Sequence, residues 1–79
     1  MGYHKIEIQK GKLGEFSKIE EEFNELKDAI SQDCKILTLC ELSDLIGSIE
    51  EYLKKFNLNI DDVKQFSDMT KSAFREGKR

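Results

Sequence analysis

The stretch from Lys35 to Phe56 is the feature that most restricts how this chain can fold. Its apolar residues recur at spacings that place them around most of the circumference of one helix. Proline, which would interrupt such a helix, is absent from the whole sequence. A helix with so little polar surface needs neighbours on several sides, so we expect it to be the central, most enclosed element of an all-α domain. The apolar residues in its first fifteen positions are Ile36, Leu37, Leu39, Cys40, Leu42, Leu45, Ile46 and Ile49.

Two further helices are predicted, one before and one after this stretch. Apolar residues spaced by three and four positions from Leu13 onward indicate a first helix that ends near residues 31–33. After the "NLN" break, Asn59 or Asp61 can cap a third helix that ends at Gly77. The apolar stripe of the first helix is Leu13, Phe16, Ile19, Phe23, Leu26 and Ile30. That of the third helix is Val63, Phe66, Met69, Ala73 and Phe74.

Two neighbouring helices cannot cover the apolar circumference of the second helix. A four-helix arrangement would cover it, provided that another copy of the chain supplies the missing helices. The sequence therefore predicts a homodimer or homotetramer with bundle-like packing.

The length and charge of the chain exclude several classes of protein. Its 79 residues fit a single domain, and its net charge of −3 argues against a nucleic-acid polymer as the main partner. No run approaches the roughly 20 apolar residues of a membrane span, and no signal-peptide pattern is present. We therefore expect a cytoplasmic protein without a membrane partner. Cys34 and Cys40 match no zinc-binding spacing and are expected to be buried or half-buried free thiols.

Residues 1–12 are predicted to form a short extended segment that precedes a helical domain of residues 13–79. His4, Ile6 and Ile8 alternate with other side chains, which is typical of an extended backbone, and two glycines end the pattern. A single strand is not stable alone, so the segment must lie on the helices or pair with another copy. A lone histidine near a terminus is more often a surface residue than a ligand, so we assign no function to His4.

Two pairs of acids, each three residues apart, lie on the first two helices. The pair Glu41 and Asp44 lies inside the apolar stretch, where a charge is costly to bury unless it is neutralised. A purely structural explanation is that either acid pairs with a lysine from another helix, or that this face of the helix is exposed. If the first two helices are antiparallel, Glu22 and Glu25 can face Glu41 and Asp44. Divalent cations would relieve the resulting repulsion, and an all-oxygen ligand set suits Mg²⁺ or Mn²⁺.

The order of these acids carries a resemblance to a known family. An ExxE motif at residues 22–25, followed after fifteen residues by ExxD at 41–44, resembles the signature of the all-α nucleotide pyrophosphatases. These are the MazG-like proteins and their relatives, which include the phosphoribosyl-ATP pyrophosphatases. Glu21 and Leu26 extend the match to "EExxEL", and "MTKSAFREGKR" resembles the closing helix of short stand-alone members. The resemblance covers residues 13–79.

The resemblance implies an oligomeric MazG-like helical fold and a metal-dependent hydrolase. Such an enzyme cleaves a nucleoside or deoxynucleoside triphosphate, or a close analogue, between the α- and β-phosphates and releases a monophosphate and pyrophosphate. Glu22 or Glu25 would also accept the proton of the attacking water. The residues that would bind Mg²⁺, or Mn²⁺, are Glu22, Glu25, Glu41 and Asp44.

Basic side chains should meet the phosphate charge that the metal leaves unbalanced. The resemblance places basic residues on the closing helix, where Lys71 and Arg75 are the candidates. Lys18, one turn before Glu22, is a further candidate. The alternative for the basic stripe on the third helix is a solvated face opposite its apolar residues.

Two other functions remain open at the level of sequence. The chain could be a non-catalytic helical oligomerisation or interaction module whose acids are ordinary surface charges. It could also be a phosphoribosyl-ATP pyrophosphatase, whose stand-alone members are similar in length. Nothing in the sequence selects the base or the sugar of a nucleotide substrate.

Overall fold

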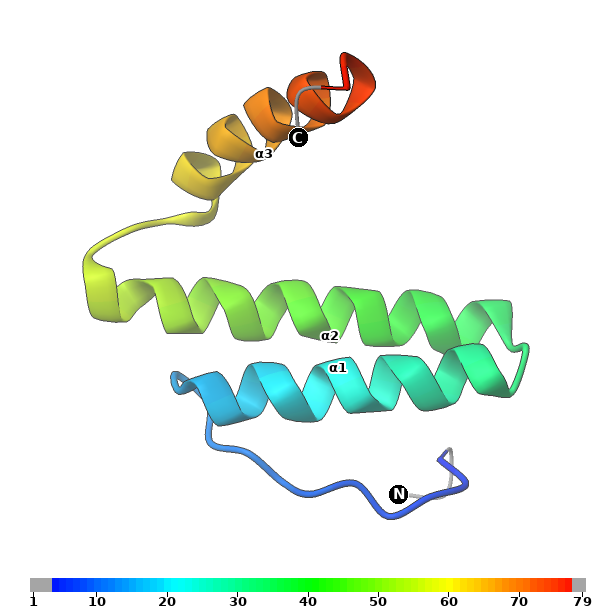
Figure 1. Ribbon diagram of the computed structural model, residues 1–79. Helices are drawn as coiled ribbons and strands as arrows, with labels where there is room; N and C mark the ends of the chain where they lie inside the picture. The colour runs from blue at the N-terminus through cyan, green and yellow to red at the C-terminus, as the bar shows by residue number, and fades with distance from the viewer. Residues whose placement is uncertain (1–3, 78–79) are drawn as a thin grey trace.

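The structure, a computed structural model, describes residues 4–77 and is all-helical (Figure 1). Helix α1 spans Phe16–Ser31, α2 spans Lys35–Leu53 and α3 spans Ile60–Arg75, with a short 3₁₀ turn η1 at Lys54–Phe56 after α2. No strand occurs within residues 4–77, so the prediction of a three-helix all-α chain is confirmed. None of the described helices has the length and hydrophobicity needed to cross a membrane.

Local sequence signals account for the helix boundaries. The first helix begins at Phe16 rather than at Leu13, because Gly14 takes a positive φ of 90° that ends the preceding turn. Of the two predicted capping residues, Asn59 and Asp61, it is Asn59 that caps α3. Its side chain accepts a hydrogen bond from the backbone of Asp62, whose carboxylate accepts one from the backbone of Asn59. This reciprocal capping box fixes the start of α3.

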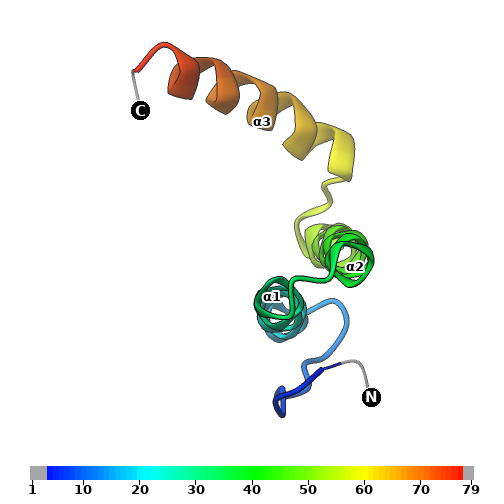
Figure 2. The ribbon, with the colours of Figure 1, turned by 90° about the vertical axis from the view of Figure 1, so that its right-hand side faces the viewer.

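The helices α1 and α2 run antiparallel and side by side (Figures 1 and 2). The short connection between them turns at Asp33, which adopts a left-handed φ of 55°. Helix α3 leaves the far end of α2 and points away from the pair, and it makes no contact with α1 within the described residues. A single chain therefore forms a helical hairpin with one projecting helix.

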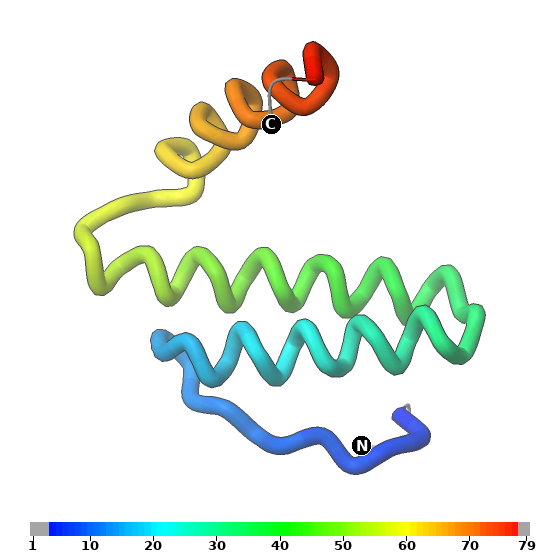
Figure 3. Tube along the Cα trace, viewed as in Figure 1, coloured from blue at the N-terminus to red at the C-terminus, as the bar shows by residue number. Residues whose placement is uncertain are grey.

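The N-terminal segment, residues 4–12, runs along α1 in the opposite direction (Figure 3). The backbone N–H of Gly11 donates to Glu21 Oε1 at 2.8 Å, and that of Lys5 donates to Asp28 Oδ2 at 3.1 Å. A side chain at Gly11 would collide with the backbone of Ser17. Of the two arrangements that the sequence allows, the segment thus takes the one in which it lies on the helices, and residues 4–12 contain no strand.

Burial in the single chain is the reverse of the usual pattern. Among residues 4–77, Ala29 and Leu53 are the only buried hydrophobic residues. By contrast, Ile36 is 74% exposed and Leu39 67% exposed. In one chain the second helix is therefore not the enclosed element that its composition predicts, since α1 covers only one side of it. The buried polar and charged residues are Glu21, Glu22, Asp28, Glu41 and Ser48.

Cys34 and Cys40 are free thiols, but both are exposed, so the expectation that they are buried or half-buried is wrong for the single chain. Residues 1–3 of the predicted extended segment, and Lys78 and Arg79 of the predicted closing helix, lie outside the described residues.

Candidate functional site

Three of the four predicted acids meet in the interface between α1 and α2. Glu22 of α1 and Glu41 and Asp44 of α2 each offer a carboxylate oxygen, and these atoms all lie within 4.8 Å of one another. Glu22 is 4% exposed and Glu41 is 6% exposed, whereas Asp44 faces solvent. The antiparallel hairpin therefore brings the two halves of the motif together at one place.

Glu25 joins the same group from the next turn of α1. One of its oxygens lies within 4.8 Å of atoms of Glu21 and Glu22, and it also approaches Glu41. We call Glu22, Glu25, Glu41 and Asp44 the acid cluster. Burial raises the pKa of Glu25, and repulsion from Glu22 and Glu41 raises it further. Burial also raises the pKa of Glu41. The folded chain therefore holds these carboxylates where their charge is disfavoured.

Two oxygens of the cluster are buried without any hydrogen-bond partner among the described residues. They are Oε1 of Glu22 and Oε1 of Glu41. Buried polar atoms nearly always have a partner, and an unsatisfied buried carboxylate oxygen is especially costly. Each helix of the hairpin contributes one of these two oxygens. Four carboxylates supply the hard oxygen donors that Mg²⁺ and Mn²⁺ bind, so the residues present fit the predicted ion.

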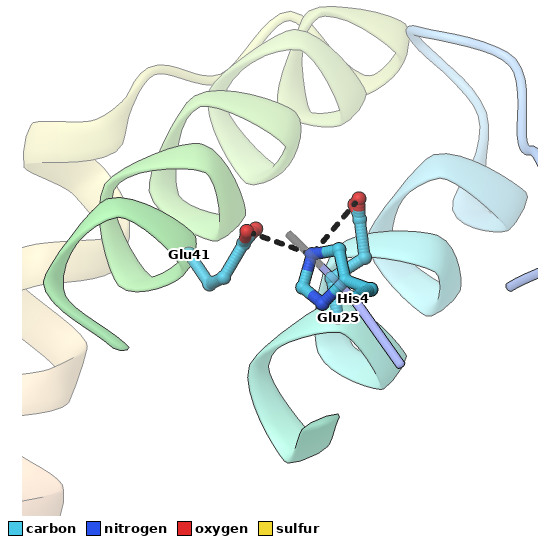
Figure 4. A group of neighbouring side chains, drawn as sticks. All are labelled: His4, Glu25 and Glu41. Atoms are coloured by element: carbon cyan, nitrogen blue, oxygen red, sulfur yellow. Dashed lines mark hydrogen bonds and ion pairs between the residues drawn. The ribbon is translucent and has the colours of Figure 1, made fainter. Parts of the chain in front are cut away.

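His4 also lies at this site, so the expectation that it is a surface residue is wrong. Its side chain is 10% exposed and lies between the two helices (Figure 4). Nδ1 lies 2.8 Å from Asp28 Oδ2, and Nε2 lies 3.0 Å from Glu41 Oε2 and 3.8 Å from Glu25 Oε1. Burial lowers the pKa of His4, but its hydrogen bonds to Asp28 and Glu41 outweigh burial and leave the pKa raised.

Asp28 was also absent from the predicted site. It is 5% exposed, and its Oδ2 accepts from His4, from the backbone N–H of Lys5 and from Gln32 Nε2. The hydrogen bond from His4 is the largest of the effects that lower its pKa. The one sequence signal for this arrangement was the alternating pattern of residues 4–8, which indicated an extended segment but did not show what it contacts.

Lys18 lies beside the cluster, as its position one turn before Glu22 predicts. Its Nζ is 3.0 Å from Glu22 Oε2 and 3.1 Å from Glu21 Oε1. The hydrogen bond to Glu22 is the main reason that the pKa of Lys18 is raised. Lys18 also lines an open cleft of about 420 Å³ together with Glu22 and Asp44. It is therefore a counter-ion of the acids and a cation at the edge of the cleft.

Lys71 and Arg75 do not reach the acid cluster of their own chain. Both lie on α3, which makes no contact with α1 within residues 4–77 and points away from the hairpin (Figure 1). Lys71 Nζ pairs with Asp68 Oδ1 at 3.2 Å on the surface of the same helix. If either residue contacts a phosphate held at the acid cluster, it must do so on another copy of the chain.

Comparison of the chain with protein-family models, curated proteins and solved structures gives no match.

Proposed function

We propose that this chain is a metal-dependent nucleotide pyrophosphohydrolase of the MazG-like kind. It would cleave a nucleoside or deoxynucleoside triphosphate, or a close analogue, between the α- and β-phosphates. One observation carries the proposal: the ExxE and ExxD acids converge between two antiparallel helices, and two of their buried oxygens have no hydrogen-bond partner among residues 4–77. Solvated surface charges would be exposed, and Glu22 and Glu41 are buried.

The acids and Lys18 would have different functions at the site. Glu22, Glu25, Glu41 and Asp44 would hold Mg²⁺, or Mn²⁺ in its place. The ion supplies positive charge to the phosphates and makes water a better nucleophile. Glu22 or Glu25 would accept the proton that the attacking water loses. Lys18, at the edge of the cleft, can attract a phosphate oxygen, since the reaction needs positioning and charge neutralisation more than covalent chemistry.

A second copy of the chain would complete both the fold and the site. Large apolar side chains of α2 and α3, among them Ile36, Leu39 and Phe66, are exposed in the single chain, and large exposed apolar patches mark interaction surfaces. Pairing of two hairpins would form a four-helix bundle and cover α2, giving a homodimer or, by further association, a homotetramer. Such pairing would also allow Lys71 and Arg75 of one chain to approach the acid cluster of the other.

The proposal is tested by incubating a panel of ribonucleoside and deoxynucleoside triphosphates with the protein and Mg²⁺. We expect a monophosphate and pyrophosphate from at least one of them, and no product in EDTA. Phosphoribosyl-ATP belongs in the panel, because its hydrolysis alone would place the chain in that branch of the family. Glu41→Gln should abolish turnover. Glu50→Gln, the same change at an exposed position of α2, should leave it intact. Orthophosphate as the first product would contradict the proposal.

The alternative is a non-catalytic helical oligomerisation module. The contact between His4 and the acids favours it, because a protonated imidazole can neutralise part of the cluster without any metal. This function predicts that millimolar Mg²⁺ or Mn²⁺ leaves the unfolding temperature unchanged, whereas an ion that binds only the folded chain must raise it.

A further inference from the structure

We propose that His4 is itself a metal ligand and that it sets the metal preference of the site. Its Nε2 atom, with Glu25 and Glu41, would form a mixed nitrogen and oxygen site that binds a divalent transition-metal ion such as Mn²⁺ in preference to Mg²⁺. The inference shares Glu25 and Glu41 with the proposed function and rests on it to that extent. It adds a ligand from a segment outside the acid motif.

The first support is the way in which the imidazole is held. Nδ1 donates to Asp28 Oδ2 at 2.8 Å, and Asp28 is fixed in turn by Lys5 and Gln32. A histidine that binds a metal almost always donates its other ring N–H to a carboxylate or carbonyl in this manner. Asp28 therefore fixes the orientation of the ring, and Nε2 is the atom directed at the acids.

The second support is the geometry around Nε2. Ligand atoms of His4, Glu25 and Glu41 all lie within 4.8 Å of one another (Figure 4). The separation of Nε2 and Glu41 Oε2 is 3.0 Å. Two ligands at right angles around an ion, each about 2.1 Å from it, are also about 3 Å apart. An ion at this place would replace the proton that Nε2 shares with Glu41.

An independent observation at the same carboxylate supports a cation site. Glu41 is 6% exposed, and its second oxygen, Oε1, has no hydrogen-bond partner among the described residues. The contact with His4 therefore satisfies only half of this buried group. A metal ion can use both oxygens of one carboxylate, whereas the imidazole reaches only Oε2.

The expected preference follows from the donor atoms. Imidazole nitrogen suits transition-metal ions, whereas Mg²⁺ favours oxygen and gives up its hydration water reluctantly. Replacing one oxygen ligand by a nitrogen should therefore favour binding of Mn²⁺ or Co²⁺ over binding of Mg²⁺. The N-terminal segment can hold this ligand because it is anchored along α1 at both Lys5 and Gly11.

The test uses the fact that the chain contains a single histidine. The untagged 79-residue chain is loaded with Mn²⁺ without nucleotide and studied by pulsed electron paramagnetic resonance. We expect nitrogen coupling from one imidazole, which changes to the ¹⁵N pattern when histidine is isotopically labelled. The coupling should disappear in His4→Gln and persist in Glu50→Gln. Bound Mn²⁺ without nitrogen coupling in the wild type would overturn the inference.

Affinity provides the second measurement. His4→Gln should weaken Mn²⁺ binding by at least about tenfold, as loss of ligand support usually does, and Mg²⁺ binding much less. If His4→Gln binds both ions as tightly as the wild type or more tightly, His4 competes with the metal and the inference is wrong. The proposed function can fail separately. Nitrogen coupling without pyrophosphate release supports the inference alone, and Mg²⁺-dependent release without coupling supports the function alone.

Discussion

The Nδ1 atom of His4 lies 2.8 Å from Oδ2 of Asp28, although the two residues are 24 positions apart in the chain. This contact joins the start of the described chain to the last turns of α1, and Nε2 of the same ring reaches Glu41 on α2. Three separate parts of the chain therefore meet at one imidazole. The stability of the hairpin and the properties of the acid cluster should depend on it.

The first prediction concerns the pH dependence of the metal-free protein. Because the pKa of His4 is raised above 6.5 in the folded chain, protonated His4 stabilises the fold. This contribution is complete below about pH 6.5 and is lost as the pH rises through the raised pKa. In EDTA, the difference in urea midpoint between wild type and His4→Gln should be largest near pH 6 and shrink toward pH 9. A constant difference across this range would show that His4 stabilises the fold only by packing.

Replacement of Glu41 tests the carboxylate repulsion. The pKa of Glu41 is raised, so the folded chain disfavours its charge, and Glu41→Gln should not destabilise the metal-free protein. We expect an unchanged Tm or a gain of about 4 °C, roughly 1 kcal/mol for a domain of this size.

Metal binding should stabilise the wild type by about 1.4 kcal/mol at a metal concentration ten times Kd, and Glu41→Gln should lose most of this gain. Thermal unfolding with and without metal measures both, and a wild type indifferent to metal would contradict the cluster.

Gly11 should control the position of the N-terminal segment. A Cβ at this residue would collide with the backbone of Ser17, so Gly11→Ala must displace the segment from α1. We expect a loss of about 1 to 3 kcal/mol, as for other overpacked sites, together with weaker Mn²⁺ binding as His4 withdraws. Lys12→Ala, at an exposed neighbour, should change stability by less than about 0.5 kcal/mol. Equal stability of the two variants would show that the close approach at Gly11 is easily relieved.

The helices and the facing acids could be predicted because both follow from local patterns. The periodicity of α1 and α2 and the short connection between them determine which faces meet, and Glu22 and Glu41 lie on those faces. The cap at Asn59 was likewise visible in the sequence. These features need only spacing along one or two neighbouring helices.

The contacts of His4 could not be predicted, because they join residues that are 24 and 37 positions apart in the chain. No periodic pattern relates an extended segment to a particular turn of a helix. The position of α3 was also beyond local signals. Resemblance placed Lys71 and Arg75 near the phosphates, but within one chain α3 turns away from the hairpin. The predicted enclosure of α2 requires surfaces that a single chain does not supply.

Self-association should depend on the exposed apolar face of α2. Wild-type protein at micromolar concentration is expected to sediment as a dimer or tetramer. Leu39 is 67% exposed, and Leu39→Glu should shift the population toward monomer because it places a charge in the buried interface. Lys35→Glu introduces the same residue at an exposed polar position of the same helix and should leave the assembly intact. A folded wild-type monomer at this concentration would remove the basis for a site shared between chains.

The last prediction tests whether two chains build one site. Because Lys71 and Arg75 cannot reach the acid cluster of their own chain, they should serve the cluster of a partner. A chain with Glu41→Gln and a chain with both Lys71→Ala and Arg75→Ala should each have low activity alone. When the two are unfolded together and refolded, random pairing gives intact sites at about a quarter of the wild-type number, with intact acids from one chain and intact basic residues from the other. Pyrophosphate release should recover to that extent. A mixture of Glu41→Gln with Glu22→Gln is the matched control: it should recover nothing, because every cluster in it contains one damaged acid. If the first mixture is no more active than its two components, the basic residues of α3 do not act across the interface, and Lys18 remains the candidate that binds phosphate.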